Sequence, residues 1–187
     1  MQKSEERELS EVVARELVRI DSMVSQMLRF SAPKAAAFST VRTHDVLEHS
    51  LRLMQHQINA KMISVKRDYR AVSQNVRGDE AQLQQVFMNL LFNAFEAMGV
   101  NGVLTVSTEI VNAKGGRILK VQIKDTGVGI PAENLSRLFE PFFTTKKNGT
   151  GLGLAISRRI VDEHHGKIEV QSEVAKGSVF LISLPAV

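Results

Sequence analysis

The sequence contains no cysteine, no tryptophan and a single tyrosine among its 187 residues. The absence of cysteine excludes disulfide bonds and thiolate metal sites. The scarcity of tyrosine and tryptophan leaves few rings on which nucleic-acid bases could stack. The net charge is +4, yet no run of lysine and arginine exceeds two residues. We therefore predict a solvated surface and no nucleic-acid partner.

Long apolar runs are also missing. No apolar stretch approaches the roughly 18 residues of a membrane-spanning helix. The opening MQKSEERELSEV is too acidic for a signal peptide. We expect no membrane segment in this chain and a cytoplasmic location.

Residues 4–30 have the pattern of one long helix. Its apolar positions are Val13, Leu17, Ile20, Val24 and Met27. Their spacing of four, three, four and three is that of a heptad seam, and the proline at position 33 ends the helix. A stripe this narrow favours a coiled coil or bundle over packing on its own domain. The chain offers no second helix of this kind.

Residues 40–187 predict alternating strands and helices after a linker at 33–39. Helices are expected at 45–60, 80–98 and 151–165, the second capped by Asp79 and the third by Gly166. Strands are expected near 40–41, at 62–69, in a hairpin with arms 102–112 and 117–125, and at 167–174 and 178–185. This order predicts an α+β fold, a two-layer α/β sandwich with three helices on a mixed sheet of about five strands, preceded by the long N-terminal helix.

Three glycines alternate in the stretch NGTGLGLAIS, directly before a helical pattern. Gly149, Gly151 and Gly153 suggest phosphate binding, because backbone N–H groups and the helix dipole favour an anion there. The P-loop and dinucleotide templates both fail, since Leu154 or Ile156 stands where their last glycine should be. Alone, the alternating glycines are weak evidence for a ligand loop.

Three further blocks accompany them. Asp125 begins DTGVGI after a strand, where its carboxylate could accept a hydrogen bond from a ligand amino group, although such turns are common in ordinary loops. Asn89 and Asn93 share one helix face. They are either two structural amides or the two partners of one polar ligand, such as hydrated Mg²⁺ with phosphates. The block FEPFFTTKK at 139–147 predicts a lid over phosphates, or a loop pinned by a small core.

These four blocks, in this order, resemble the catalytic ATP-binding domain of sensor histidine kinases, in the GHKL (Bergerat-fold) superfamily. NLLFNAFEAM resembles the N box, DTGVGI the first glycine box, FEPFFTTK the F box and GTGLGL the second glycine box. The resemblance covers residues 40–187. Within the family, FEPFFTTKKNGTGLGLAI and the ending HHGKIEVQSEVAKGSVFLISLP look most like the nitrogen-regulation (NtrB-like) class.

The resemblance implies roles for residues of this sequence, with ATP and Mg²⁺ as cofactors. Asp125 would receive the adenine amino group, Asn93 would coordinate Mg²⁺, and Asn89 and Lys146 would face the phosphates, these last three being the catalytic residues. Glu96 departs from the many relatives with a basic residue there, so that phosphate contact does not carry over. The other implied ATP-binding residues are Gly127, Gly129, Ile130, Gly149, Thr150, Gly151, Leu152, Gly153, Leu154 and Ser178.

Residues 1–32 resemble the second helix of the dimerisation and phosphotransfer hairpin. The H-E-x-x-x-P motif of the first helix is absent, so none of the five histidines is expected to be the phosphoacceptor. The resemblance implies a histidine-bearing helix outside this chain, a response regulator as partner, and a homodimer in the full protein.

The expected reaction is transfer of the γ-phosphoryl group of Mg-ATP to that external histidine. Superfamily ATPases of the gyrase and Hsp90 types carry a glutamate where Asn89 stands. An amide cannot take a proton from water, which favours transfer over hydrolysis. The alternatives are a GHKL protein-serine kinase and a nucleotide-binding dimerisation or docking module without turnover.

Overall fold

A computed structural model of the protein describes residues 37–113, 116–146 and 149–187. The described residues fall in one compact unit. The predicted N-terminal helix and most of the predicted linker lie outside the described residues. None of the described helices is long and apolar enough to cross a membrane.

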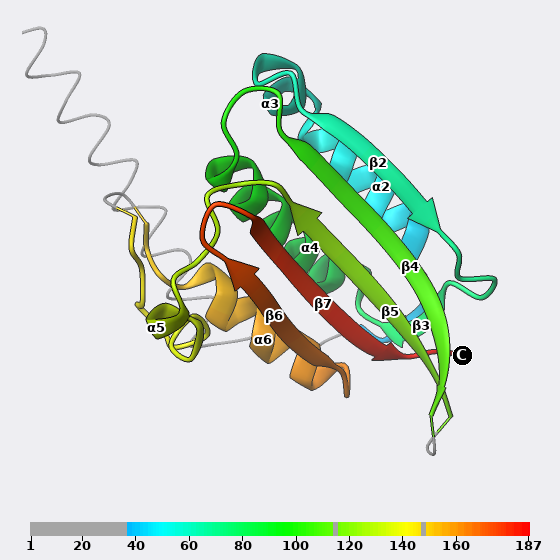
Figure 1. Cartoon of the computed structure of the whole chain (residues 1–187). Coiled ribbons are helices and arrows are strands. Elements are labelled where there is room, and N and C mark those ends of the chain that lie inside the picture. Colours follow the sequence, from blue (N-terminus) through cyan, green and yellow to red (C-terminus); the bar gives the residue numbers. More distant parts are fainter. Residues whose placement is uncertain (1–36, 114–115, 147–148) are drawn as a thin grey trace, which may run out of the picture. The chain divides into compact units, whose positions relative to one another are not determined.

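The centre of this unit is a five-stranded mixed sheet (Figure 1). Its strands, in spatial order, are β2 (Ser64–Tyr69), β4 (Val103–Ala113), β5 (Gly116–Asp125), β7 (Gly177–Pro185) and β6 (Lys167–Glu173). The β2–β4 pair is parallel and the other pairs are antiparallel. The predicted mixed sheet of about five strands is therefore present.

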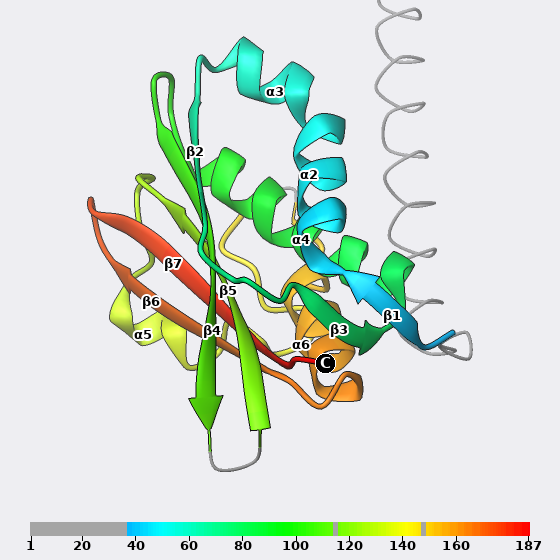
Figure 2. The same ribbon diagram turned by 90° about the vertical axis from the view of Figure 1, so that its right-hand side faces the viewer.

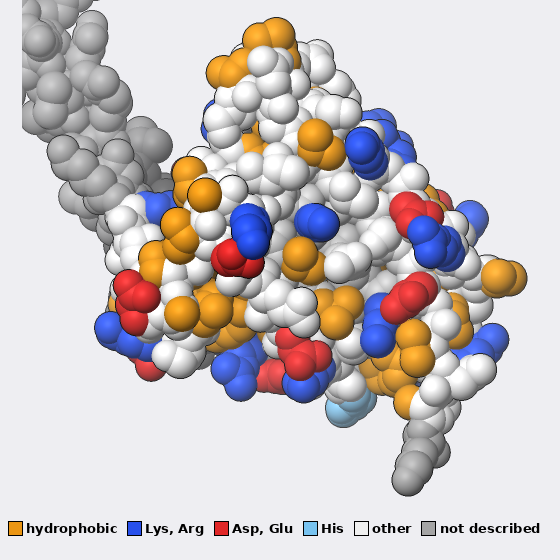
Figure 3. Space-filling view, in the orientation of Figure 1, with side chains coloured by type: hydrophobic (Ala, Val, Ile, Leu, Met, Phe, Trp, Pro, Cys, Tyr) orange, Lys and Arg blue, Asp and Glu red, His pale blue; other side chains and the backbone are white. Residues whose placement is uncertain are grey.

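The larger helices cover one face of this sheet, as the edge-on view in Figure 2 shows. They are α2 (Thr43–Leu53), α4 (Glu80–Ala97) and α6 (Gly153–Glu163). The short helix α3 (Gln55–Ala60) follows α2, and the short helix α5 (Ala132–Leu135) lies beside β6 (Figure 1). The opposite face of the sheet is open, and Figure 3 shows acidic and basic side chains interspersed on it.

The core lies between α4 and the inner face of the sheet. Helix α4 has apolar residues on more than one side, and it buries them against β5 and β7 as well as against α2 and α6. Strand β5 alternates, with Leu119, Val121 and Ile123 buried. Each such side chain contributes about 1.5–3 kcal/mol when fully removed from water. The core therefore fixes α4, and α4 carries the predicted asparagines.

Two local predictions were wrong in detail. The predicted helix at 45–60 is divided into α2 and α3 at Met54, whose N–H is shared between the carbonyls of Ser50 and Leu51 in a tightened turn. The predicted cap at Gly166 is replaced by His165, which holds the left-handed conformation (φ 55°). Glycine is needed at 166 because a Cβ there would lie 2.5 Å from the carbonyl oxygen of Ser183.

A second, two-stranded sheet was predicted only in part. The expected strand near 40–41 is β1 (Ser39–Arg42), and it pairs antiparallel with β3 (Asn75–Gly78), which the sequence did not suggest. A bridge between Val76 and Ala186 joins β3 to the end of the chain. β3 has four residues, and its only buried apolar side chain is Val76, too little for a periodic signal.

Candidate functional site

The four blocks of the sequence meet beside α4 and the start of α6. The loop after β5 reaches the C-terminal end of α4, where the N–H of Val128 donates to the carbonyl of Ala97 at 3.1 Å. The segment before α6 reaches the C-terminal part of α4 through Lys146. Segments far apart in sequence are thus brought to one region of the fold.

Asp125 is the buried carboxylate of this region. It ends β5, is 2% exposed, and its Oδ1 accepts hydrogen bonds from the N–H groups of Gly127 at 2.8 Å and Ser178 at 3.3 Å. Burial raises the pKa of Asp125 above its usual value, and these backbone donors oppose the shift. Among the described residues, no other residue donates a hydrogen bond to Oδ2. Oδ2 is therefore suited to accept from the amino group of a ligand.

Gly127 and Gly129 are required by the protein's own backbone. A Cβ on Gly127 would lie 2.6 Å from the carbonyl oxygen of Ala97. Gly129 has φ +72°, and a Cβ there would lie 2.1 Å from the carbonyl oxygen of Glu173. These two glycines let the loop press against α4 and the β6–β7 turn, which explains them without an adenine.

Ser178 and Ser172 fix the end of this loop. Ser178 is buried, and its Oγ lies 3.0 Å from Oγ of Ser172. Ser172 Oγ accepts from the N–H of Ile130 at 2.8 Å and donates to the carbonyl of Gly177 at 2.8 Å. The predicted residues Ile130 and Ser178 are therefore connected through Ser172. Sequence reasoning missed Ser172, because a serine near the end of an edge strand gives no pattern.

Asn89 fastens α4 to the first turn of α6. Its Nδ2 donates to the carbonyl of Gly153 at 3.0 Å and to Oγ of Ser157 at 3.2 Å, and Ser157 is fully buried. Ser157 Oγ in turn donates to the same Gly153 carbonyl at 2.9 Å. Asn89 therefore has a structural role in joining the two helices, and its contact with phosphates stays a prediction.

Asn93 contacts the lid lysine. Nζ of Lys146 donates to Oδ1 of Asn93 at 2.8 Å and forms an ion pair with the carboxylate of Glu96. The backbone N–H of Lys146 is itself held by Oγ1 of Thr144 at 3.1 Å. The structure thus brings Lys146 to two side chains of α4 that lie about 50 residues earlier in the sequence.

The phenylalanine block packs against the glycines that follow it. Phe142 has φ 67°, is 60% exposed, and its N–H donates to the carbonyl of Gly151 at 3.0 Å. Gly151 has φ +68°, and a Cβ there would lie 2.4 Å from the carbonyl carbon of Phe142. Phe143 lies under the guanidinium of Arg137, and Phe139 under that of Arg158. The conformation of this block therefore depends on glycine at 151.

The remaining predicted residues lie between the phenylalanine block and the first turn of α6. Leu152 is buried, Leu154 is half-buried, and Oγ1 of Thr150 accepts from the N–H of Leu152 at 3.4 Å. A Cβ on Gly149 would lie 2.3 Å from Oγ1 of Thr144. On Gly153 a Cβ would meet nothing closer than 3.7 Å, at the side-chain amide of Asn89.

The donor set fits a metal that arrives with phosphates. Within residues 37–113, 116–146 and 149–187, no group of three or more His, Cys, Asp or Glu could hold a metal ion. The amide oxygen of Asn93 is a hard ligand of the kind Mg²⁺ uses, and Mg²⁺ keeps several waters and takes substrate phosphates as ligands. Asn93 would therefore hold a nucleotide-bound metal, together with phosphate oxygens and water.

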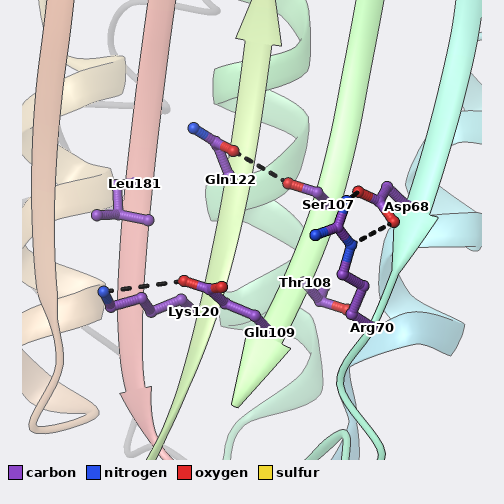
Figure 4. Close-up of a pocket in the computed structure, with 8 residues that line it drawn as sticks. All are labelled: Asp68, Arg70, Ser107, Thr108, Glu109, Lys120, Gln122 and Leu181. Carbon is purple, nitrogen blue, oxygen red and sulfur yellow. Dashed lines mark hydrogen bonds and ion pairs between the residues drawn. The ribbon is translucent and has the colours of Figure 1, made fainter. Parts of the chain in front are cut away.

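A pocket of about 290 Å³ on the open face of the sheet is a different place (Figure 4). The cationic Arg70 pairs with Asp68, and Lys120 lies 3.9 Å from Glu109. None of the predicted site residues lines this pocket. It is a depression among charged side chains on the open face of the sheet, away from the predicted site residues.

Comparison with known proteins finds matches over most of the chain. Residues 78–187 match the family described as histidine kinase-, DNA gyrase B-, and HSP90-like ATPase. Sporulation kinase C of Bacillus subtilis (strain 168) is 37% identical over 94% of this chain and 40% of its own length. Sensor histidine kinase ZraS of Escherichia coli (strain K12) is 36% identical over 97% of this chain and 38% of its own length.

The fold is shared with the histidine kinase ThkA. Its nucleotide-free catalytic domain is 33% identical, with a TM-score of 0.71 over 79% of this chain and 95% of that one. ThkA in complex with the response regulator protein TrrA is 29% identical, with a TM-score of 0.78 over 94% of this chain and 50% of that one. The present chain spans about two fifths of the length of the curated relatives named above.

Proposed function

This chain belongs to the family of histidine kinase-, DNA gyrase B- and HSP90-like ATPases, and from that membership we propose that it is the ATP-binding catalytic part of a sensor histidine kinase. The reaction transfers the γ-phosphoryl group of Mg-ATP to an imidazole nitrogen of a histidine outside this chain. The bond between the γ-phosphorus and the bridging oxygen breaks, ADP leaves with the electron pair, and a P–N bond forms. The phosphoryl group then passes to an aspartate of a response regulator.

The observation that carries this proposal is the buried carboxylate of Asp125 beside the α4–α6 region. Its Oδ2, to which no other residue of the described part of the chain donates a hydrogen bond, would accept from the adenine amino group. Asn93 and Lys146 lie together on the α4 side, where the triphosphate and its metal would be held. Phosphoryl transfer needs mainly such positioning and charge neutralisation.

Several finer assignments belong to this proposal. Residues 1–32 would be the second helix of the phosphotransfer hairpin, 33–39 the linker and 40–187 the catalytic domain. This chain would be cytoplasmic, and the full protein would be a homodimer whose hairpin supplies the phosphoacceptor histidine. The NtrB-like class remains a prediction from the F-box and C-terminal sequences, and the relatives named above are ZraS and a sporulation kinase.

The deciding experiment supplies ATP labelled at the γ-phosphate, Mg²⁺ and a separate hairpin that carries H-E-x-x-x-P, taken from a related kinase. Acid-labile label on the hairpin supports the kinase. Tight nucleotide binding without label, on hairpins from several relatives, would instead support a binding module without turnover. A hairpin with histidine replaced by glutamine is the matched control and should stay unlabelled.

A further inference from the structure

The side-chain ammonium of Lys146 lies on α4, where the metal ligand is expected. Its Nζ is 2.8 Å from Oδ1 of Asn93 and pairs with the carboxylate of Glu96. Asn93 and Glu96 are three residues apart, so they share one face of α4. Lys146 comes from the segment before α6, about 50 residues further along the chain. One lid cation is therefore held by two neighbouring side chains of the helix.

A carboxylate at Glu96 is unfavourable for a triphosphate site unless a cation accompanies it. Its side chain is 41% exposed and that of Lys146 is 43% exposed, so both can move without disturbing the core. The ion pair neutralises Glu96 and supplies a positive charge from the lid. The positive charge that the N box lacks at position 96 is thus supplied by an exposed side chain of the segment before α6.

Lys146 and a metal ion would compete for the same amide oxygen of Asn93. Mg²⁺ would bind Oδ1 at about 2.0–2.1 Å with octahedral geometry. An ammonium hydrogen-bonded to the same oxygen places a second positive charge within a few ångströms, and the two charges repel. The contact of Lys146 with Asn93 is therefore disfavoured once a metal ion binds the same oxygen.

We propose that Glu96 is a positioning residue that holds Lys146 against Asn93 in the nucleotide-free protein, and that Lys146 leaves both side chains when metal-bound nucleotide arrives. Freed from α4, the ammonium is close in sequence to Gly149 and Gly153 and is available to the phosphates. The identity of the ligand rests on the proposed function. We call the contacts of Lys146 with Asn93 and Glu96 the latch. The latch rests on these observed contacts and not on the proposed function.

Hydrogen exchange of residues 139–152, followed by mass spectrometry, tests the latch without using catalysis. In the nucleotide-free protein, Glu96→Gln is expected to raise the exchange rate of this segment by about two- to fivefold, the range for an exposed ion pair. Lys146→Gln should raise the exchange rate at least as much, because it also removes the hydrogen bond to Asn93, and adding Glu96→Gln to Lys146→Gln should change nothing further, because Lys146 is the shared partner of both contacts. With Mg²⁺ and a non-hydrolysable ATP analogue, wild type and Glu96→Gln should exchange equally.

The matched control is Glu80→Gln, which removes the same charge from the first turn of α4, away from the lid. Unchanged lid exchange in nucleotide-free Glu96→Gln would overturn the latch. A difference that persists equally with the metal-bound analogue would overturn the exchange of cations, because Lys146 would then stay on Glu96. If the wild type binds no nucleotide, the proposed function fails, while the comparison in the free protein still decides whether the latch exists.

Discussion

Nε2 of His164 accepts a hydrogen bond from the backbone N–H of Asp79 at 2.9 Å. His164 ends α6 and is buried, while Asp79 caps α4. Nδ1 of His164 lies 2.7 Å from the carbonyl of Ile160, so the neutral ring with its proton on Nδ1 satisfies both contacts. The ring also lies against Phe38, with centroids 4.8 Å apart. This one side chain joins the C-terminus of α6, the N-terminus of α4 and the start of the described chain.

Replacing His164 should weaken the whole fold. His164→Ala leaves a cavity and unpairs the N–H of Asp79, which together cost about 2–4 kcal/mol in the free energy of unfolding. Urea denaturation followed by circular dichroism measures this. His165→Asn is the control, because His165 is exposed and asparagine tolerates its left-handed backbone. Equal stability of the His164 variant and wild type would show that the contacts of His164 contribute nothing to the free energy of unfolding.

Asp79 makes stability depend on pH in the acidic range. Its Oδ1 accepts from the N–H of Gln82 at 3.0 Å and its Oδ2 from that of Ala37 at 2.9 Å. Burial alone would raise the pKa of Asp79, but these N–H donors outweigh it and hold the pKa below its ordinary value. A carboxyl group with a lowered pKa stabilises the fold above its unfolded pKa, and that contribution is lost as the pH falls through the folded pKa.

Asp79→Ala should therefore destabilise the protein at neutral pH and less so in acid. Loss of the N-cap costs about 0.5–2 kcal/mol. Urea unfolding of wild type and variant at a series of pH values should show the difference shrinking from about pH 4 downward. A difference that stays constant down to the acid limit would mean that the charge of Asp79 contributes nothing. Asp79→Asn keeps the capping oxygen and should lie between the two.

Asp125→Asn separates stability from ligand binding. The amide oxygen can still accept from the N–H groups of Gly127 and Ser178, but an NH₂ group would stand in place of Oδ2 and meet the ligand's amino group donor to donor. Nucleotide affinity should fall by about 10- to 100-fold, the value of a lost hydrogen bond to a charged group. Calorimetric titration with the ATP analogue measures this, and wild-type affinity would remove Asp125 from the site.

The same substitution has an opposite effect on the free protein. Burial raises the pKa of Asp125, so protonation favours the folded state and ionisation disfavours it at higher pH. The contribution of Asp125 to the stability of the wild type should therefore rise as the pH falls through the raised pKa of the folded state. Asp125→Asn, being neutral throughout, should unfold at a higher temperature than wild type at pH 7 and lose that advantage in acid. Calorimetry of unfolding without nucleotide checks both points.

The sequence predicted those parts of the fold that repeat along the chain. The periodicity of α4, the cap at Asp79 and the hairpin of β4 and β5 are local patterns, and the structure confirms them. Strand β3 could not be predicted, because it exists only through pairing with a distant strand and buries one apolar side chain. An element was predicted from the sequence where its own residues form a strong local pattern. Its distance along the chain from the elements that it contacts was not decisive.

The candidate site, like the fold, was predictable from the sequence only in part. Its residue types were recognisable from four blocks in order, but the contacts among them were not. Asn89 is engaged with α6, and Lys146 reaches α4 beside Glu96, which depends on how the lid segment folds over the helix. Ser172 carried no signal, since only the packing of the β6–β7 turn gives its hydroxyl three partners.

Gly151 and Gly153 provide a matched pair that separates folding from binding. Gly151→Ala puts a side chain into a left-handed backbone and 2.4 Å from Phe142, which should lower the free energy of unfolding by about 1–3 kcal/mol. Gly153 begins α6 and has no positive φ, and its added Cβ would make only an ordinary contact with Asn89. Gly153→Ala should therefore leave stability unchanged or raise it by about 0.4–1 kcal/mol, because alanine loses less backbone freedom.

Gly153→Ala, although stable, is expected to bind nucleotide more weakly than wild type. Since the fold does not need glycine at position 153, a loss of affinity for the ATP analogue in a stable Gly153→Ala protein would mean that the phosphates approach the first turn of α6 closely. We expect a loss of at least about tenfold, the size of one unsatisfied contact. If Gly153→Ala binds as tightly as wild type, the triphosphate does not lie at this helix start, and the alternating glycines serve only the turn around Phe142.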